Sequence, residues 1–304
     1  MTKNRATRTR WNVLSVGLLV CLIVYCICLL SPLILAFLNS FKDLRGDYLV
    51  GNATGLPRKW LFSNYADVFK YMIVEVTDSS GKSVGVDILG MYGHSLLYAG
   101  GCAFTATLAP CLMAYCCAKF PCKFSKVIYT TVIVCMVLPI VGNLPSEIRI
   151  AQSVGVYNQI WGLWIMKFGF LGIYFLVFYA TFEGIPMTYT EAAKIDGAGN
   201  WRIFLQIIMP LVKNTFFTIM LIKFTEFWND YQTPFIYLED YPTIALGLQM
   251  AFDNSLARRA DNPMTANTTL CMAATMLVLL PILTVFLIFQ KRFLGDLMIG
   301  GVKG

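Results

Sequence analysis

The chain has 304 residues, of which 57% are hydrophobic and only 13% charged, and its mean hydropathy is positive. About a quarter of the residues in a soluble domain are charged. The composition therefore excludes an ordinary soluble enzyme and predicts one polytopic membrane unit. The net charge of +7 does not indicate nucleic-acid binding, because the basic residues stand in short clusters beside long apolar runs, as topology signals do.

Six apolar segments are each near the ~20 residues that a helix needs to cross a bilayer core. The sequence thus predicts an all-α integral membrane protein whose six-span domain covers residues 11–290, between an N-terminal segment 1–10 and a tail 291–304. The first segment is too long for the core of a signal peptide, so we expect it to be retained. The six segments are Trp11–Leu38, Ser95–Ala118, Ser125–Val141, Trp161–Phe182, Leu211–Phe235 and Leu270–Phe289.

Basic residues predict the orientation of these spans. With the N-terminus in the cytoplasm, the clusters before the first span, after the second, between the fourth and fifth, and after the sixth all lie inside. Both termini and the loop 183–210 are then cytoplasmic, and the long loop 39–94 is outside. The basic residues placed inside are Lys3, Arg5, Arg8, Arg10, Lys119, Lys123, Lys126, Lys194, Arg202, Lys213, Lys291, Arg292 and Lys303.

None of the ten cysteines lies in a loop placed outside, and nine of them lie in or at the edge of apolar runs. They are expected to be small hydrophobic residues rather than bridges or metal ligands. His94, the only histidine, lies at a span boundary, where a helix-start role is favoured over a gate. The Gly81-Lys82-Ser83 triplet lacks the earlier glycine of a nucleotide-binding P-loop. We therefore expect no ATP site and no catalytic group in this chain.

The loop 183–210 is the most polar segment between two spans. Thr188 and Glu191 have the spacing of a capping box, which predicts a helix from about Tyr189. Gly197 and Gly199 predict a bend after it. A second helix is expected next, and Pro210 is expected to mark the junction with the fifth span. The apolar residues at helical spacing in this second helix are Trp201, Phe204, Leu205 and Ile208.

By composition alone this helix–bend–helix element has two interpretations. Its small first helix, with Ala192 and Ala193, is a surface that another protein could approach closely. The alternative is an amphipathic loop that only covers the bundle.

The motif favours the first interpretation. The stretch resembles the EAA loop of ABC importer permeases, which in that family is the coupling helix held in a groove of the cytoplasmic ATPase. Lys213-Asn214 departs from the proline that the family often has after this motif. The residues in register are Glu191, Ala192, Ala193, Gly197, Ala198, Phe204, Ile207, Pro210 and Leu211.

Other segments are similar to the second permease of maltose-type carbohydrate importers. These are the C-terminal tail with Gly300, Gly301 and Lys303, the segment Phe227–Phe235 that contains Trp-Asn-Asp, and the outer-loop residues Pro57, Trp60, Asn64 and Tyr65. The likeness is weakest over residues 75–91, and His94-Ser95 replaces the family's Asn-Ser.

The resemblance implies a permease of a bacterial cytoplasmic membrane that imports a carbohydrate. Its implied partners are a second homologous permease, two cytoplasmic ATPase subunits and a substrate-binding protein outside, in addition to membrane lipid. ATP and Mg²⁺ would be bound by the ATPases and no cofactor by this chain. The tail residues Gly300, Gly301 and Lys303 would give a second contact to the ATPases.

Lys223, Glu226 and Asp230 share one face of the predicted fifth span, with Asn229 and Trp228 beside them. Charges at membrane depth are costly unless they pair or face water. They are therefore either a pair that fixes helix packing or a polar wall of the substrate pathway, and both roles stay open.

Two other functions remain as alternatives to a carbohydrate importer. A secondary transporter would use these charges with an ion gradient, and a sensor subunit would report a ligand without moving it. An ABC importer permease for a solute other than sugar is the remaining possibility.

Overall fold

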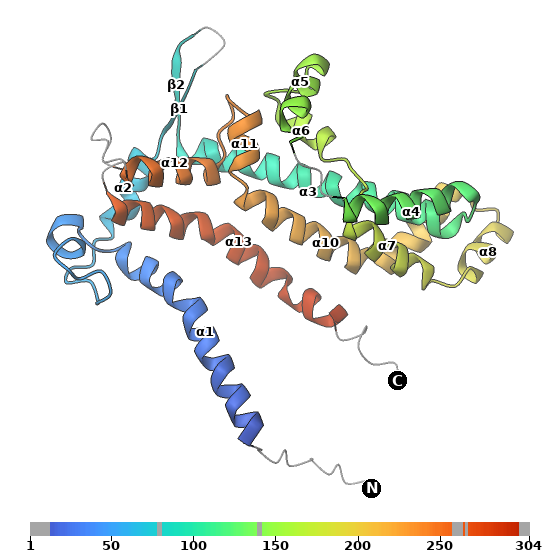
Figure 1. The fold of residues 1–304 in the computed structure, drawn as a ribbon, viewed down its shortest axis with the longest axis horizontal. Coiled ribbons are helices and arrows are strands. Elements are labelled where there is room, and N and C mark those ends of the chain that lie inside the picture. The colour runs from blue at the N-terminus through green and yellow to red at the C-terminus, as the bar shows by residue number, and fades with distance from the viewer. Residues whose placement is uncertain (1–12, 78–80, 139–141, 257–263, 265–266, 298–304) are drawn as a thin grey trace.

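The computed structural model describes residues 13–77, 81–138, 142–256, 264 and 267–297 (Figure 1). Most of them form helices, and two of the helical elements, η1 and η2, are π-helical turns. The elements are α1 (Val13–Asn39), η1 (Leu44–Tyr48), α2 (Ser63–Tyr71), β1 (Val74–Thr77), β2 (Ser83–Val86), α3 (Ile88–Lys119), α4 (Lys123–Val137), α5 (Leu144–Val154), α6 (Ile160–Met166), α7 (Ile173–Glu183), α8 (Thr188–Ile195), α9 (Asn200–Ile203), η2 (Phe204–Ile208), α10 (Met209–Asn229), α11 (Gln232–Tyr237), α12 (Ile244–Leu256) and α13 (Thr268–Leu297).

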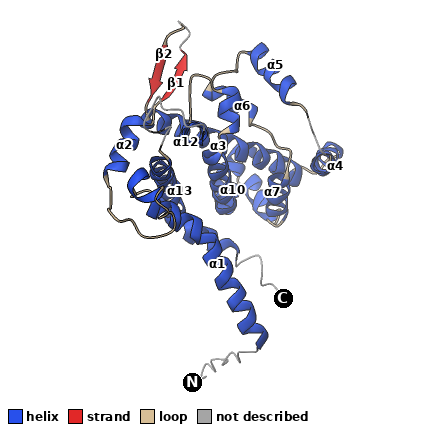
Figure 2. Cartoon of the chain, turned by 60° about the vertical axis from the view of Figure 1, so that its left-hand side comes forward, coloured by secondary structure: helices blue, strands red, loops and turns tan. Residues whose placement is uncertain are grey.

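Helix α3 is the centre of the bundle. It packs against α10, α7 and α6 (Figure 2), and half of its most apolar stretch is buried inside the protein. Two hydrophobic cores lie along it. The first contains Tyr98, Cys102 and Trp228, and the second contains Tyr115 and Phe204. Because Met220 of α10 contacts both, the two cores form one continuous interior.

Among the described residues, four helices are long and apolar enough to cross a membrane, not the six that the sequence predicts. These four correspond to the predicted first, second, fifth and sixth spans, although the fifth ends at Asn229 rather than Phe235. The predicted third span, Ser125–Val141, is the 15-residue helix α4, which ends at Val137. The four helices are Leu14–Asn39, Ile88–Lys119, Asn200–Asn229 and Thr268–Phe289.

The predicted fourth span, Trp161–Phe182, is two helices rather than one. Helix α6 ends at Met166 and α7 begins at Ile173. Hydropathy is high on both sides, so the break has a backbone cause. Gly172 has φ +136°, a conformation that L side chains rarely adopt, and it directly precedes α7. The sequence signal was the pair Gly169 and Gly172.

The sequence predicts that Pro210 marks the junction between a surface helix and the fifth span, but no break occurs there. Residues Asn200–Asn229 form one continuous helix. The π-helical turn η2 lies directly before Pro210, and Met209 N–H donates to the carbonyl of Phe204, five residues back. This turn shifts the hydrogen-bond register, so the helix continues past a residue that has no N–H to donate.

The fold is not entirely α-helical. Strands β1 and β2 form an antiparallel hairpin in the first loop, with Val74 opposite Val86 and Thr77 opposite Ser83. Alternating β-branched residues favour this pairing. The hairpin projects from the bundle (Figure 1), and it falls in the segment with the weakest family likeness.

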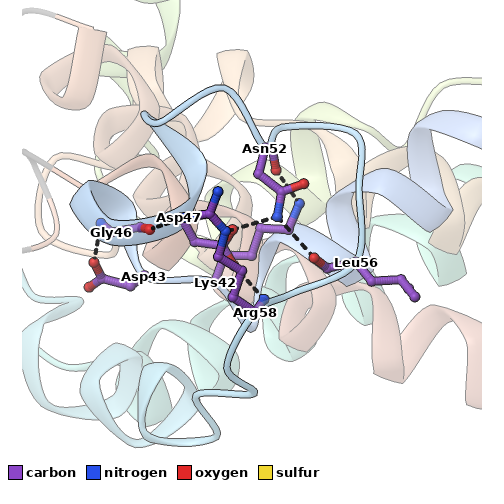
Figure 3. A network of polar contacts seen from close by, with 7 residues as sticks. All are labelled: Lys42, Asp43, Gly46, Asp47, Asn52, Leu56 and Arg58. Carbon is purple, nitrogen blue, oxygen red and sulfur yellow. Dashed lines mark hydrogen bonds and ion pairs between the residues drawn. The ribbon is translucent and has the colours of Figure 1, made fainter.

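The start of the first loop is fixed by a buried polar network (Figure 3). The Lys42 side chain is fully buried, and its ammonium donates to the carbonyl of Asn52. The Asp47 carboxylate accepts from the Asn52 amide and, at 2.8 Å, from the Arg58 backbone N–H. Burial alone would raise the pKa of Asp47, but these hydrogen bonds and the charges of Lys42 and Arg58 lower it below its ordinary value.

A second clasp joins the α5–α6 connection to the segment after α11. Asn158 is held at φ +56°. Its backbone N–H donates to the carbonyl of Tyr237, and its side chain exchanges two hydrogen bonds with Asp240, at 2.7 and 3.1 Å. Tyr157 donates to Glu239, and burial together with this carboxylate raises the pKa of Tyr157. The clasp therefore holds the chain just before α6 against the segment that follows α11.

We predict that Gly101→Ala destabilises the α3–α6 contact. A Cβ at Gly101 would collide with the indole of Trp164, which donates to the carbonyl of Leu97 at 3.1 Å. Overpacking of this kind lowers the free energy of unfolding by about 1–3 kcal/mol, measurable by thermal unfolding in detergent. Gly100→Ala is the matched control, because a Cβ there has nothing within 4 Å; equal loss in both variants would contradict the prediction.

We also predict that Asp47→Asn loosens residues 43–61, seen as faster amide hydrogen exchange there. Because the folded-state pKa of Asp47 is lowered, its stabilisation is complete above the unfolded value near ~3.9. It is lost as the pH falls through the lower folded-state value. Asp67→Asn in neighbouring α2 is the control. Unchanged exchange in Asp47→Asn would show that the network does not hold the loop.

Candidate functional site

The first helix of the predicted helix–bend–helix segment and the bend after it form as the sequence predicts, whereas the second helix is the start of the long helix Asn200–Asn229. Helix α8 covers Thr188–Ile195, and Gly197 follows with φ +77°. The Gly197 N–H donates to the carbonyl of Lys194, and the Ala198 N–H donates to that of Ala193. This pair of bonds is a Schellman motif, which ends the helix and needs a left-handed residue at its turn. Gly197 therefore has a defined backbone role.

The predicted capping box is wrong. The residue before α8 is Met187, in a helical conformation, and no side chain caps the helix. Thr188 is the first helical residue rather than the cap. Instead, Pro186 and Met187 already carry the chain into a helical turn, in which Thr190 and Glu191 donate to the carbonyl of Met187.

The two alanines of the motif point in different directions. Ala193 is buried in the second core, and Thr190 is also buried. Ala192 and Glu191 are exposed, and Ile195 is 87% exposed. Ala193 therefore holds α8 to its own bundle, and Ala192 is available to another protein.

The connection before α8 is fixed by Lys119, at the end of α3. Its side chain is buried, and its ammonium donates to the carbonyl of Ile185 at 2.6 Å. The sequence identified Lys119 only as an orientation signal. In the structure it ties the end of α3 to the start of the α8 segment.

Phe204 connects the same segment to α3. It is 4% exposed, and its ring lies 4.6 Å from that of Tyr115, which also contacts Phe182 at 5.5 Å. Displacement of the α8–α9 segment must therefore displace this aromatic group. Trp201, by contrast, is 72% exposed. The tail residues Gly300, Gly301 and Lys303 lie outside the described residues.

The second candidate site lies between α3, the α6–α7 break and α10. Lys223 and Glu226 form an ion pair of 2.8 Å, with side chains that are 18% and 55% exposed. The Lys223 ammonium also lies 4.9 Å from the centre of the Tyr174 ring, a cation–π distance. All three residues line a cavity of about 330 Å³, which is within the size range of ligand pockets.

The other predicted pathway residues do not line this cavity. Asp230 lies just beyond the end of α10, where its carboxylate accepts from the Tyr98 hydroxyl at 2.9 Å and the Thr233 N–H at 3.0 Å. Trp228 is buried in the first core. Asn229 is exposed, and its amide donates to the carbonyl of Thr225. The predicted common face is therefore reduced to Lys223 and Glu226.

The structure adds Lys167 to the site. This residue follows the last turn of α6 and lines the same cavity as Lys223 and Glu226. Lys167 is absent from the predicted site because the sequence predicts residues 161–182 to form one helix. A lysine beside Gly169 and Gly172 in the middle of an apolar segment was the signal.

Comparison with known proteins identifies related chains over most of this length. Residues 106–298 match the family described as "binding-protein-dependent transport system inner membrane component". The melibiose/raffinose/stachyose import permease protein MelC of Bacillus subtilis (strain 168) is 28% identical over 275 residues, covering 90% of this chain and 91% of that protein. The galactooligosaccharides transport system permease protein GanQ of the same organism is 26% identical, and the match covers 100% of this chain and 99% of that protein.

A solved structure shares the fold. A chain of a bacterial ABC transporter involved in the import of the acidic polysaccharide alginate matches with a TM-score of 0.71. The match has 22% identity and covers 94% of this chain and 100% of that one.

We predict that the two halves of the Lys223–Glu226 pair contribute unequally. Glu226→Gln leaves the largely buried ammonium of Lys223 without its partner and lowers the free energy of unfolding by about 1–3 kcal/mol. Lys223→Met leaves the more exposed carboxylate, which water solvates, and lowers it by less than about 1 kcal/mol.

The double variant Lys223→Met/Glu226→Gln is the control and should be close to wild type, since neither charge is left unpaired. Thermal unfolding gives the stabilities, and uptake by the reconstituted importer gives the second readout. Normal uptake in both single variants, with only stability changed, would restrict the pair to a packing role.

Proposed function

The chain belongs to the family of binding-protein-dependent transport system inner membrane components, and we propose that it imports an oligosaccharide as one permease subunit of an ATP-driven complex. The observation that carries the coupling part of this proposal is α8, an exposed short helix tied to α3 through Lys119 and Phe204. Its proposed partners are a second homologous permease, two cytoplasmic ATPases and a substrate-binding protein.

We infer six membrane crossings. Helix α4 and the interrupted pair α6–α7 pack against α3, as the long helix α10 does, so they share its surroundings. Together with the four long helices they give an even number of crossings and place both termini on one side. The basic residues next to the spans support a cytoplasmic location for that side.

Coupling is proposed to act through α8 as a lever. Closure of the ATPases would move the exposed Ala192 surface, and the Schellman turn at Gly197 would keep α8 and α9 in a fixed relation. The movement would reach α3 through Phe204 and Tyr115 and would change which side of the membrane can reach the pathway. Gly300, Gly301 and Lys303 are proposed as a second contact to the ATPases.

Oligosaccharide is proposed as cargo because of the relatives' names. MelC and GanQ are named for the import of oligosaccharides, and the solved transporter for an acidic polysaccharide. These names include neutral and acidic sugars, so they do not decide between the two. The Lys223–Glu226 cavity is proposed as part of the pathway because charged groups at this depth need a polar surface.

Uptake by the complete complex tests the cargo. Proteoliposomes that contain both permeases and the ATPases, with ATP at the ATPase side, would receive the binding protein and pooled hydrolysates of starch and polygalacturonan. We expect saccharides to accumulate in the lumen, as measured by mass spectrometry. Accumulation of saccharides that is driven by an ion gradient and does not depend on ATP would instead favour a secondary transporter.

We predict that Ala192→Trp uncouples transport, because the bulky ring lies on the exposed side of α8 and blocks close docking. Stimulation of ATP hydrolysis by the loaded binding protein should fall about tenfold or more, equivalent to a loss of ~1.4 kcal/mol or more of docking energy. Thermal stability of the permease should not change.

The contrasting variant is Ala193→Trp. Its side chain is directed into the second core, so it should lower stability as well as activity. If Ala192→Trp leaves ATPase coupling normal, α8 is not the docking surface.

A further inference from the structure

The cavity beside the α6–α7 break carries one positive charge in excess. Three ionisable side chains that are charged at neutral pH line it, namely Lys167, Lys223 and Glu226. Lys223 and Glu226 neutralise each other at 2.8 Å. The Lys167 side chain, which is half-buried, forms no hydrogen bond or ion pair within the part of the chain that the structure describes.

No acid forms an ion pair with Lys167 in the part of the chain that the structure describes. The next carboxylate along the chain after Glu226 is Asp230, just beyond the end of α10, and its two oxygens accept hydrogen bonds from Tyr98 and Thr233 instead. Asp230 also lies outside the lining of the cavity. An unpaired ammonium among apolar helices is unfavourable unless it faces water or an anion. The cavity gives Lys167 access to both.

The rest of the lining fits a sugar better than a small inorganic anion. The rings of Phe170, Tyr174 and Phe227 border the cavity, and aromatic faces pack well against the apolar faces of sugar rings. A volume of about 330 Å³ is also larger than a small inorganic ion needs. Glycines 169 and 172 leave part of the wall without side chains, which gives a ligand room to reach Lys167.

We propose that this cavity binds an acidic sugar unit whose carboxylate is held by Lys167, with Lys223 as a second donor and Tyr174 beside the ring. The inference rests on the proposed saccharide import and narrows its substrate class to anionic saccharides. In the empty cavity Lys223 is ion-paired with Glu226. An arriving carboxylate binds first to Lys167 and then competes with Glu226 for Lys223, so the ion pair keeps the second lysine from holding the cargo permanently.

The pooled-uptake experiment separates this inference from the proposal on which it depends. Oligogalacturonates accumulating in preference to maltooligosaccharides of the same length are the expected result. Maltooligosaccharides accumulating alone would confirm saccharide import and overturn the anionic specificity. Accumulation of neither class would contradict the proposed import, and this inference with it.

Substitution then tests the site, with trigalacturonate as the probe. Lys167→Met should reduce its uptake about tenfold or more, the effect expected for loss of one charge-assisted hydrogen bond. Lys167→Arg should retain most of the uptake. Thermal stability should be equal or higher in Lys167→Met, because an unpaired charge is removed, and this separates a binding defect from misfolding.

Lys123→Met is the matched control. Lys123 is an exposed lysine at the start of α4 that does not line the cavity, so this variant should transport trigalacturonate normally. Equal uptake in Lys167→Met and wild type would overturn the site. Equal loss in Lys167→Met and Lys123→Met would also overturn it, because the effect would then be one of overall charge.

Discussion

The close packing of α3 against α10 is the contact on which the other parts of this protein depend. Helix α3 can be half-buried because many of its buried residues are small, among them Ala99, Cys102 and Ala103, and small residues let helices approach closely in a membrane. Gly101 admits the Trp164 ring of α6, and Pro110 and Ala106 border the cavity. One helix thus positions the α8 segment at one end and the clasped loops at the other.

A charged side chain among apolar helices is costly unless it has a partner or faces water, and the charged residues near α3 meet this requirement in different ways. Lys119 donates to a backbone carbonyl, Asp230 accepts from a tyrosine and a backbone N–H, and Lys223 pairs with Glu226. Each of these charged groups therefore has a partner within the protein. Of these five charged residues, only Lys167 faces the cavity without a hydrogen-bond or ion-pair partner among the described residues, and it is therefore the centre of the proposed substrate site.

Helical periodicity predicts a common face for Lys223, Glu226 and Asp230, but the structure does not keep the three together. Lys223, Glu226 and Asp230 have helical spacing, but the helix ends at Asn229, and Asp230 turns toward Tyr98. Trp228 is directed into the first core and donates weakly, at 3.4 Å, to the carbonyl of Val278. Spacing predicts which residues share a face; it does not predict what covers that face. For the α8 segment the sequence did better, because the helix end needs a left-handed residue and Gly197 adopts that conformation without strain, whatever packs against it.

By itself, the sequence determined the membrane class, the four long apolar helices and the glycine-bent α8 segment, since hydropathy, charge clusters and glycine act locally. Only the tertiary structure decided that the fourth apolar segment is broken, that Pro210 lies within a continuous helix, and that Ala193 faces inward while Ala192 faces out. It also brought Lys167 to the cavity of Lys223 and Glu226, more than fifty residues away along the chain. The physical reason is the same in each case. An apolar run predicts that a segment is buried in lipid or protein. Whether a given side chain faces inward or outward depends on which helix packs against it.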